Sequence, residues 1–388
     1  MRVEIHHDAQ GGHPLKNRKG FAWLIAVLAV LSILASACGS DSEGSDAGTS
    51  DSDSTTPAAV DTSGFAELTA TLNGQGSSFQ DTFQQQVTSD FGTAVSEAGG
   101  SATVTYTKSG SSDGKKALAD QTADFAGSDS PIKDEEMASF GGRDILYFPI
   151  VGGPITVAFN LEGIEELNLS PDTVAGIFQG EITSWDDDAI AADNEGVELP
   201  STAITVVHRS DGSGTTKNFT KWLTKAAPDT WTLDSGEEVE WPSTTTGAEK
   251  STGVTAVIKD TDGAVGYVDL ADAAKESLTV AAIGNADGEF VAPTPDSASA
   301  ALGAAEIADD LTYDPLNASA AGAYPITSPT WVLVDKVQSD EGKAAVLKAY
   351  LNYMLTTGQG QAKALLYAPL PEDLAAKAVA QIDEITVG

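Results

Sequence analysis

Residues 204–226 (ITVVHRSDGSGTTKNFTKWLTKA) place a strand, a turn and a helix in one short stretch. Ile204–Arg209 is rich in β-branched residues and predicts a strand. Thr215–Ala226 predicts a helix, and the segment Arg209–Thr216 between them consists mainly of glycine, serine and threonine. A strand that passes through a short polar turn into a helix is a typical unit of α/β proteins, so this stretch predicts an α/β fold.

The same alternation extends through the rest of the chain. Further strands are expected at Glu67–Leu72, Ala102–Thr107, Asp144–Ile150, Ile155–Asn160 and Ala264–Val268. Further helices are expected at Ser78–Phe91, Lys115–Thr122, Ser170–Gln179, Glu341–Leu355, Gln359–Leu366 and Pro371–Ile382. This order implies an α/β architecture whose strands are mostly parallel or mixed.

The first 37 residues have the pattern of a secretory signal peptide. A flank with four Lys and Arg residues precedes the largely apolar segment 21–37, which ends in small residues. We therefore expect export and removal of residues 1–37. A retained membrane helix is the alternative, although this segment is short for a span of about 20 residues.

Cys38, the only cysteine of the chain, follows directly after these small residues. Its position resembles the lipidated cysteine of bacterial lipoproteins, although Leu34 lies one place further upstream than is usual. We expect a lipid anchor at Cys38, with release by an ordinary signal peptidase as the alternative. Residues 38–63 are rich in Ser, Asp, Gly and Thr and predict a solvated linker.

Length and charge limit what the globular part can be. About 325 residues are too many for one ordinary core and predict two lobes. The formal net charge of the chain is −36, and loss of the four basic and two acidic residues of the leader gives −38. Such a charge excludes nucleic acid as a partner, and it requires that any anion be bound by local groups against the field of the whole protein.

Three glycine- and serine-rich segments are expected where a strand ends and a helix begins. They are Gly74–Phe79, Gly110–Gly114 and Arg209–Thr216. A helix N-terminus presents free N–H groups and a partial positive charge, glycines allow close approach, and hydroxyls add donors. Each segment alone is usually only a helix cap, but three of them, with Arg209 as a formal cation, predict an oxyanion site. Asp211 is either a turn residue or an ion-pair partner that holds Arg209.

The sequence gives little support for a catalytic site or a metal site. Outside the leader the chain has one histidine, His208, which with a single cysteine cannot form a His/Cys metal site. A Ser-His-Asp triad would have to use His208, which more simply ends the strand beside Arg209. No segment matches a nucleotide-binding loop or a nucleophile elbow.

The ordered motifs of the chain resemble the phosphate-binding proteins that serve bacterial ABC-type phosphate importers. The resemblance runs from about Leu72 to the C-terminal helices. It rests on Gly74–Phe79, Gly110–Gly114, Asp124–Pro131, Gly180–Ile182 with Trp185–Asp187, Arg209–Thr215, Gly263–Asp269 and Tyr324–Thr327. It implies a two-lobed fold like that of class II periplasmic binding proteins, with the ligand cleft between the lobes and strands that cross a hinge.

The resemblance also implies the ligand contacts and the domains. The expected phosphate-binding residues are Ser78, Phe79 through its backbone, Ser111, Asp129, Arg209, Ser213, Gly214 and Thr215. Asp129 would accept a hydrogen bond from protonated phosphate and repel sulfate. Lobe I is expected to contain residues 64–153 and 324–388, and lobe II residues 154–323, with crossings at Pro149–Pro154 and Tyr324–Ser328.

Three residues depart from the usual family pattern. Ser78 replaces a threonine, Gln80 stands where proline is usual, and Asp113 replaces a glycine. Asp113 matters most, because an inward carboxylate would lie near the anion.

The implied function is high-affinity, extracytoplasmic phosphate binding by a monomer, and delivery to the permease subunits of an ABC importer. No cofactor, metal or catalytic activity is expected, and the protein would sit on the outer face of the cytoplasmic membrane as a lipoprotein. Three alternatives stay open: a receptor for sulfate, molybdate or a phosphate ester, a secreted phosphatase of related fold, and an adhesive or sensory surface protein.

Overall fold

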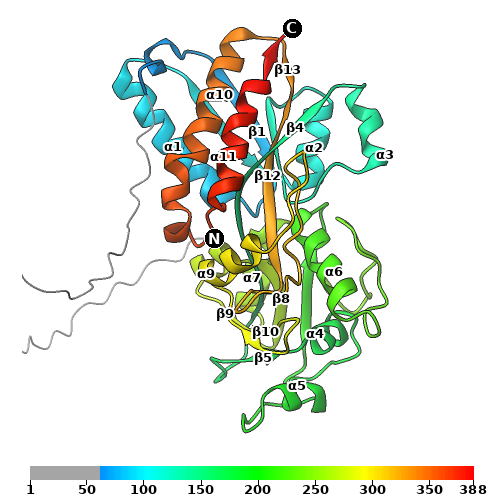
Figure 1. Ribbon diagram of the computed structural model, residues 1–388. Helices are drawn as coiled ribbons and strands as arrows, with labels where there is room; N and C mark the ends of the chain where they lie inside the picture. Colours follow the sequence, from blue (N-terminus) through cyan, green and yellow to red (C-terminus); the bar gives the residue numbers. More distant parts are fainter. Residues whose placement is uncertain (1–61) are drawn as a thin grey trace, which may run out of the picture. The chain divides into compact units, whose positions relative to one another are not determined.

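Strand β4 (Ile145–Phe159) runs through the middle of the molecule and joins the two halves of its central sheet (Figure 1). The computed structural model describes residues 62–388. The expected signal peptide, Cys38 and nearly all of the linker lie outside these residues. The described part is a mixed α/β fold, as predicted from the alternating strands and helices.

The central sheet has nine strands in the order β2-β1-β3-β12-β4-β8-β6-β7, with β9 paired to β4. Its other strands are β1 (Thr71–Gly76), β2 (Thr103–Lys108), β3 (Phe125–Ser128), β6 (Thr205–Arg209), β7 (Thr246–Ala248), β8 (Ala264–Asp269), β9 (Thr279–Val280) and β12 (Thr327–Asp335). Parallel pairs occupy both ends, β2-β1-β3 in one half and β8-β6-β7 in the other. Because the carboxyl ends of parallel strands lead into helices, each half can present helix N-termini at one edge.

Strands β4 and β12 connect the two halves. β12 pairs antiparallel with the first part of β4, from Ile145 to Pro154, and β8 pairs with the rest, from Ile155 to Phe159. The two strands expected at Asp144–Ile150 and Ile155–Asn160 are therefore one strand. The β4–β12 register shifts once, where Thr330 faces Val151 and the next residue, Trp331, faces Pro149.

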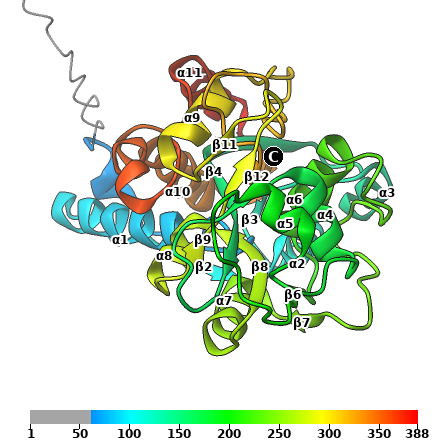
Figure 2. The same cartoon turned by 90° about the horizontal axis from the view of Figure 1, so that it is seen from below.

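Helices cover both faces of the sheet (Figures 1 and 2). They are α1 (Asp81–Ala98), α2 (Ser111–Ala119), α3 (Asp134–Met137), α4 (Pro171–Phe178), α5 (Asp188–Asp193), α6 (Gly214–Ala226), α7 (Lys250–Asp260), α8 (Leu270–Lys275), α9 (Pro295–Gly303), α10 (Glu341–Leu355) and α11 (Glu372–Gln381). The expected helix at Gln359–Leu366 is wrong, because this region forms two short 3₁₀ turns, η3 (Thr357–Gln361) and η4 (Lys363–Leu365). Two small sheets, β5 (Asn168–Leu169) with β10 (Ala282–Gly284) and β11 (Phe290–Val291), and β13 (Val337–Gln338) with β14 (Thr386–Val387), complete the described fold.

Gly74 and Gly76 belong to strand β1 and not to a turn. The expected strand Glu67–Leu72 is therefore placed too early. β1 lies between the parallel strands β2 and β3, so its glycines have a neighbouring strand on both sides. A Cβ at Gly74 would lie 2.1 Å from the ring of Phe125, and a Cβ at Gly76 2.1 Å from the carbonyl oxygen of Gly127. These glycines serve close packing of strands, and the turn before α1 is limited to Ser77–Gln80.

A single large hydrophobic cluster extends through both halves of the sheet. Trp185 and Trp331 are fully buried, and their indole N–H groups donate to the carbonyl oxygens of Gly263 and Leu311 at 3.0 Å. None of the helices within residues 62–388 is long and apolar enough to cross a membrane.

Gly74→Ala should lower the free energy of unfolding by about 1–3 kcal/mol, because the added methyl group overlaps the buried ring of Phe125. The control is Gly92→Ala in the interior of α1, where a Cβ meets no atom within 4 Å. Alanine is about 1 kcal/mol more favourable than glycine in a helix, so this change should stabilise the protein. Urea denaturation of both variants measures the difference, and equal effects would contradict the close packing at Gly74.

Candidate anion-binding site

Three polar turns meet where the two halves of the sheet face each other. They lie before α1, α2 and α6, at Ser77–Gln80, Ser109–Gly110 and Ser210–Ser213. A Cβ at Gly110 would lie 2.8 Å from the carbonyl oxygen of Gly212, and one at Gly214 would lie 2.5 Å from Ser111 Oγ. The turns are thus in direct contact, and glycine is required there because no side chain fits between them.

Arg209, the last residue of β6, extends from one half toward the other. Its side chain is 2% exposed. Nη1 donates to Ser78 Oγ at 3.1 Å, while Nε and Nη2 donate to the two carboxylate oxygens of Asp211 at 2.7 and 2.5 Å. Ser78 Oγ also lies 3.0 Å from Ser251 Oγ at the start of α7. The guanidinium is therefore held in one orientation, with one edge on Asp211 and the other on the turn before α1.

Asp211 is ionised and fixes this guanidinium. Burial alone would raise the pKa of Asp211, but the hydrogen bonds and charge of Arg209 outweigh it, and the pKa lies below its usual range. The amide N–H of Lys250 also donates to Asp211 Oδ1 at 2.9 Å. The pair is neutral overall, so it presents directed N–H donors without adding net charge.

Asp129 lies beneath the three turns, 1% exposed, in the segment after β3. Its Oδ2 accepts from Ser77 Oγ at 2.6 Å and from Thr215 Oγ1 at 3.5 Å, and its Oδ1 accepts from Thr330 Oγ1 at 2.7 Å. Its amide donates to Ser111 Oγ at 3.3 Å, and its carbonyl oxygen accepts from Asn218 Nδ2 at 2.7 Å. Its partners thus come from both halves of the sheet.

Burial raises the pKa of Asp129 to about 6. Hydrogen bonds from Ser77 and Thr330 and the charge of Arg209 oppose this rise, whereas the charge of Glu237 adds to it. Desolvation of a carboxylate is only partly balanced by such hydrogen bonds. Asp129 is consequently ionised at neutral pH but gains a proton in mild acid.

The other residues expected to contact phosphate surround the same point. Ser213 caps α6, its Oγ accepting from the amide of Thr216 at 3.2 Å, and Gly214 is the first residue of that helix. Ser111 is the first residue of α2. The amide of Phe79 donates to Ser77 Oγ at 3.0 Å. All eight expected residues are buried or at a buried turn within one region.

The two departures at positions 80 and 113 have different consequences. Asp113 is exposed, so its carboxylate does not enter the group of expected ligand residues. Gln80 is fully buried, and its Nε2 donates to Thr330 Oγ1 at 2.7 Å. Because Thr330 accepts that bond, its own hydroxyl hydrogen is available to Asp129. Gln80 therefore orients a donor to the buried carboxylate.

Sequence reasoning missed Thr330, Asn218 and Ser251, which contact the expected site residues. Thr330 lies some 200 residues from Asp129, and Ser251 lies 173 residues from Ser78. None of them belongs to a glycine-rich turn or carries a local signal. Only Ser77, inside the first turn, could have been selected from its position beside Ser78.

His208 has a structural role in the described fold. Its Nδ1 lies 2.9 Å from the carbonyl oxygen of Arg209, and its ring stacks on Trp241 with 5.0 Å between centroids. Burial lowers its pKa. Within residues 62–388 no group of three or more His, Cys, Asp or Glu side chains could hold a metal ion.

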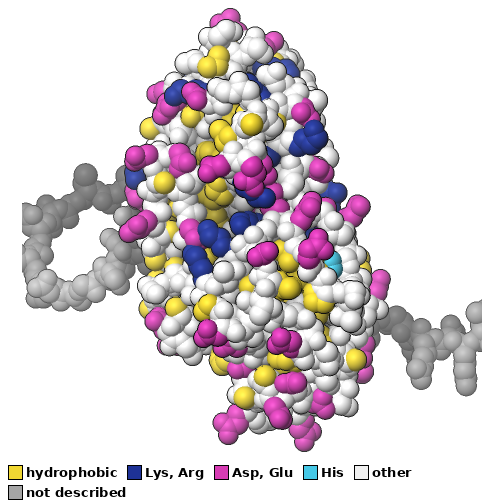
Figure 3. Space-filling model, turned by 90° about the vertical axis from the view of Figure 1, so that its right-hand side faces the viewer, with side chains coloured by type: hydrophobic (Ala, Val, Ile, Leu, Met, Phe, Trp, Pro, Cys, Tyr) yellow, Lys and Arg dark blue, Asp and Glu magenta, His cyan; other side chains and the backbone are white. Residues whose placement is uncertain are grey.

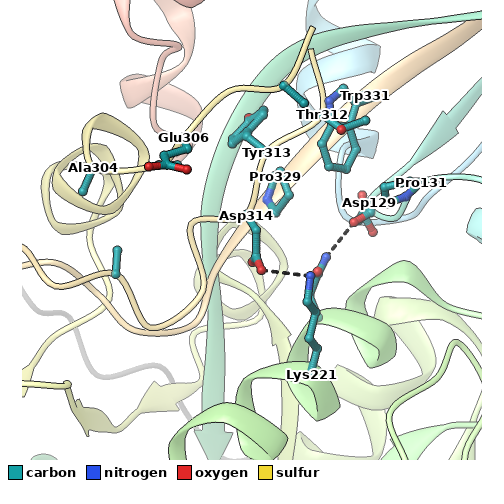
Figure 4. Close-up of a pocket in the computed structure, with 14 residues that line it drawn as sticks. Asp129, Pro131, Lys221, Ala304, Glu306, Thr312, Tyr313, Asp314, Pro329 and Trp331 are labelled. Carbon is teal, nitrogen blue, oxygen red and sulfur yellow. Dashed lines mark hydrogen bonds and ion pairs between the residues drawn. The ribbon is translucent and has the colours of Figure 1, made fainter. Parts of the chain in front are cut away.

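Two cavities are lined in part by residues of this region. One, of about 580 Å³, is lined by Asp129, Asn218 and Lys221, and Figure 4 shows Lys221 of α6 paired with Asp314 at 2.9 Å. The other, of about 670 Å³, is lined by Arg209 and Glu238 among others. Acidic side chains are spread over the face shown in Figure 3, whereas Lys and Arg gather near its middle. Basic side chains thus lie among acidic ones near the middle of this face, and at the turns Arg209 and Lys115 are paired with carboxylates.

Comparisons with known proteins agree on one family. The model of the PBP superfamily domain matches residues 48–357. The phosphate-binding protein PstS of Xylella fastidiosa (strain Temecula1) is 33% identical over 330 residues, which cover 84% of this chain and 87% of the relative. The phosphate-binding protein PstS3 of Mycobacterium bovis (strain BCG) is 32% identical over 379 residues, which cover 95% of this chain and 99% of the relative.

Solved structures share the fold. A high-affinity periplasmic phosphate-binding protein (PfluDING), determined with bound phosphate, superposes with a TM-score of 0.67 and 23% identity, covering 80% of this chain and 93% of the other. The ancestral soluble variant of the human phosphate-binding protein gives a TM-score of 0.67 with 21% identity, covering 80% and 94%. The two-lobed architecture is therefore that of periplasmic-binding-protein-like proteins.

The raised pKa of Asp129 predicts a specific pH dependence of stability. The native state keeps a proton on this carboxyl at pH values where the unfolded chain has lost it. The free energy of unfolding that Asp129 contributes should therefore fall between pH 4 and 7, by about 3 kcal/mol for a shift of roughly two pKa units. Urea denaturation in phosphate-free buffer should show the stability of the wild type relative to Asp129→Asn declining over this window. A constant or rising difference would contradict the raised pKa.

Proposed function

This chain belongs to the phosphate-binding proteins of the periplasmic-binding-protein (PBP) superfamily, and on that premise we propose that it binds inorganic phosphate outside the cytoplasm and delivers it to an ABC importer. The observation that carries the proposal is the contact of Arg209 with Ser78, together with Asp129 beneath them. A cation, hydroxyl donors and an acceptor are thus gathered from both halves of the sheet around one point. This arrangement suits a small, partly protonated oxyanion.

The donors around this point suit the oxygens of a tetrahedral anion. Arg209 offers a planar fork of N–H groups, and charge-assisted hydrogen bonds of this kind contribute about 1.5–3 kcal/mol each. Helices α2 and α6 begin here with Ser111 and Gly214, and their N-termini carry partial positive charge. We assign phosphate contacts to Ser78, the backbone of Phe79, Ser111, Arg209, Ser213, Gly214 and Thr215.

We assign selectivity to Asp129. At neutral pH its carboxylate is ionised and accepts hydrogen bonds, so a phosphate oxygen that carries a proton can donate to it. Sulfate has no such proton at neutral pH, and its oxygens would face an uncompensated negative charge. The buried position strengthens this repulsion, because little water screens it.

We further propose that lobe closure captures the ligand. Residues 64–153 and 324–388 form lobe I, and residues 154–323 form lobe II. Ser78, Ser111 and Asp129 then belong to lobe I, while Arg209 and Thr215 belong to lobe II. Phosphate favours closure because only the closed form brings both sets of donors to one anion. β4 and β12 pass between the lobes, in keeping with the expected crossings.

The remaining features of the proposal concern anchoring and activity. Cys38 would carry a lipid that holds the monomer at the outer face of the cytoplasmic membrane, with residues 38–63 as a tether. The protein would be non-catalytic, in keeping with the structural position of His208 between Arg209 and Trp241.

Calorimetric titration with phosphate, arsenate and sulfate tests the function. The wild type should bind phosphate tightly and sulfate at least 100-fold more weakly. Asp129→Asn removes the repulsion of sulfate, so the ratio of phosphate to sulfate affinity should fall on the order of 10- to 100-fold. Each factor of ten corresponds to about 1.4 kcal/mol. The wild-type protein used for the titrations should not hydrolyse a chromogenic phosphate ester. Equal wild-type affinity for sulfate and phosphate would refute the role of Asp129, and turnover of the ester would favour a phosphatase.

Mass spectrometry of the membrane fraction tests the anchor. The N-terminal peptide of the mature protein should begin at Cys38 and carry acyl chains. Cys38→Ala should release the protein into the medium or leave it with an uncleaved leader. An unmodified Cys38 in a released wild-type protein would overturn the lipid anchor without affecting phosphate binding.

A further inference from the structure

Glu237 extends from the segment between α6 and β7 into the opposite half of the molecule. Its side chain is 4% exposed. The carboxylate accepts from Ser112 Oγ at 2.6 Å and from Ser130 Oγ at 2.5 Å, and it lies 2.7 Å from Lys115 Nζ. Ser112 and Lys115 belong to α2, and Ser130 follows β3. Three donors of one lobe thus enclose a single carboxylate of the other.

The backbone of Glu237 is tied to the proposed phosphate site. Its carbonyl oxygen accepts from the amide of Ser213 at 3.0 Å. Ser213 in turn caps α6, beside Gly214 and Thr215. A displacement of Glu237 therefore pulls on the turn that carries the lobe II donors.

The contact is a buried ion pair. Lys115 is 3% exposed and also pairs with Glu136 at 2.9 Å. Burial would raise the pKa of Glu237, but the charge and hydrogen bond of Lys115 and the two serine hydroxyls bring it below its usual value. The carboxylate is therefore ionised. Loss of Lys115 would leave the Glu237 charge buried with only the two serine hydroxyls, which is strongly unfavourable, whereas loss of Glu237 would leave Lys115 paired with Glu136 alone.

We propose that Glu237 is a positioning residue that latches the two lobes in the closed form. Its carboxylate docks into the group of Ser112, Lys115 and Ser130, and it does so whether or not phosphate is present. The inference rests on the proposed capture of phosphate by lobe closure. The apparent dissociation constant equals the intrinsic one divided by the fraction of closed protein, so a latch that favours closure tightens binding without touching the ligand.

The latch also predicts which kinetic step changes. Phosphate leaves only after the lobes part, and parting requires the Glu237 carboxylate to leave its donors. Loss of the latch should therefore act mainly on the dissociation rate, as is usual for changes within one interface. Glu237 has no assigned contact with the anion and acts on Asp129 only through its charge, so the ratio of phosphate to sulfate affinity should change far less than in Asp129→Asn.

Glu237→Gln in the full-length exported protein tests the latch, with Glu240→Gln as the control. Glu240 is an exposed carboxylate of the same segment, so both variants change the net charge equally. In small-angle X-ray scattering without ligand, Glu237→Gln should have a larger radius of gyration than the wild type, and Glu240→Gln should not. Its phosphate affinity should fall on the order of 10- to 100-fold, mostly through faster dissociation, while the phosphate-to-sulfate ratio changes far less than in Asp129→Asn.

Two further variants test whether Glu237 and Lys115 act as a pair and whether a milder change weakens the latch. Lys115→Met combined with Glu237→Gln removes both charges, and it should bind phosphate better than either single variant if the two residues act as a pair. Ser112→Ala removes one donor and should produce a smaller shift in the same direction, even if Glu237→Gln does not fold. Scattering curves and phosphate affinities of Glu237→Gln and Ser112→Ala equal to those of the wild type would overturn the latch.

Phosphate binding and the latch can be tested separately. A wild type that does not bind phosphate contradicts phosphate capture. The ligand-free scattering of Glu237→Gln then decides the latch independently, because closure is measured there without any anion.

Discussion

A carboxylate that is removed from water must be hydrogen-bonded, and at Asp129 this requirement draws several distant segments together. Its partner Ser77 precedes α1, Ser111 begins α2, Thr330 lies on β12, and Thr215 lies on α6. The cost of burial is visible in the pKa, which stays raised despite these bonds. Placing a negative group at the centre of an anion site is unfavourable unless the ligand carries a proton. With the phosphate contact proposed for Asp129, its burial would link the stability of the protein to the choice of its ligand.

The charges around Asp129 are also balanced by nearby partners. A chain with a net charge of −36 has no long-range attraction for phosphate, so binding depends on groups in contact with the anion. Arg209 is already paired with Asp211, and Lys115 with Glu237, so no excess of positive charge is stored near the turns. What remains is a set of oriented N–H and O–H groups that cannot reorganise freely. Such preorganised donors are effective because their cost of orientation is met during folding.

Sequence reasoning succeeded where the signals are local. The strand at residues 204–209 and the helix at residues 215–226 agree with β6 and α6 within one residue at each end, because β-branched residues and a serine cap specify them nearby. It failed at Gly74 and Gly76, whose glycines serve packing against Phe125 and Gly127, and at Gly152–Gly153, which continue β4 because β12 pairs alongside. Among the site residues, Asp129 and Arg209 could be proposed as ligand contacts because they lie within the ordered motifs. Thr330, Asn218, Ser251 and Glu237 could not be selected, since their contacts exist only after the chain has folded.

The irregular register between β4 and β12 has a mechanical consequence. Where Trp331 faces Pro149, the ladder lacks one N–H donor, because proline has none. A strand bends most readily at such a point. Thr330 occupies this point and donates to Asp129. With the proposed hinge at β4 and β12, the curvature of these strands and the proton affinity of Asp129 would be coupled, because bending would move the Thr330 hydroxyl that stabilises the ionised carboxylate.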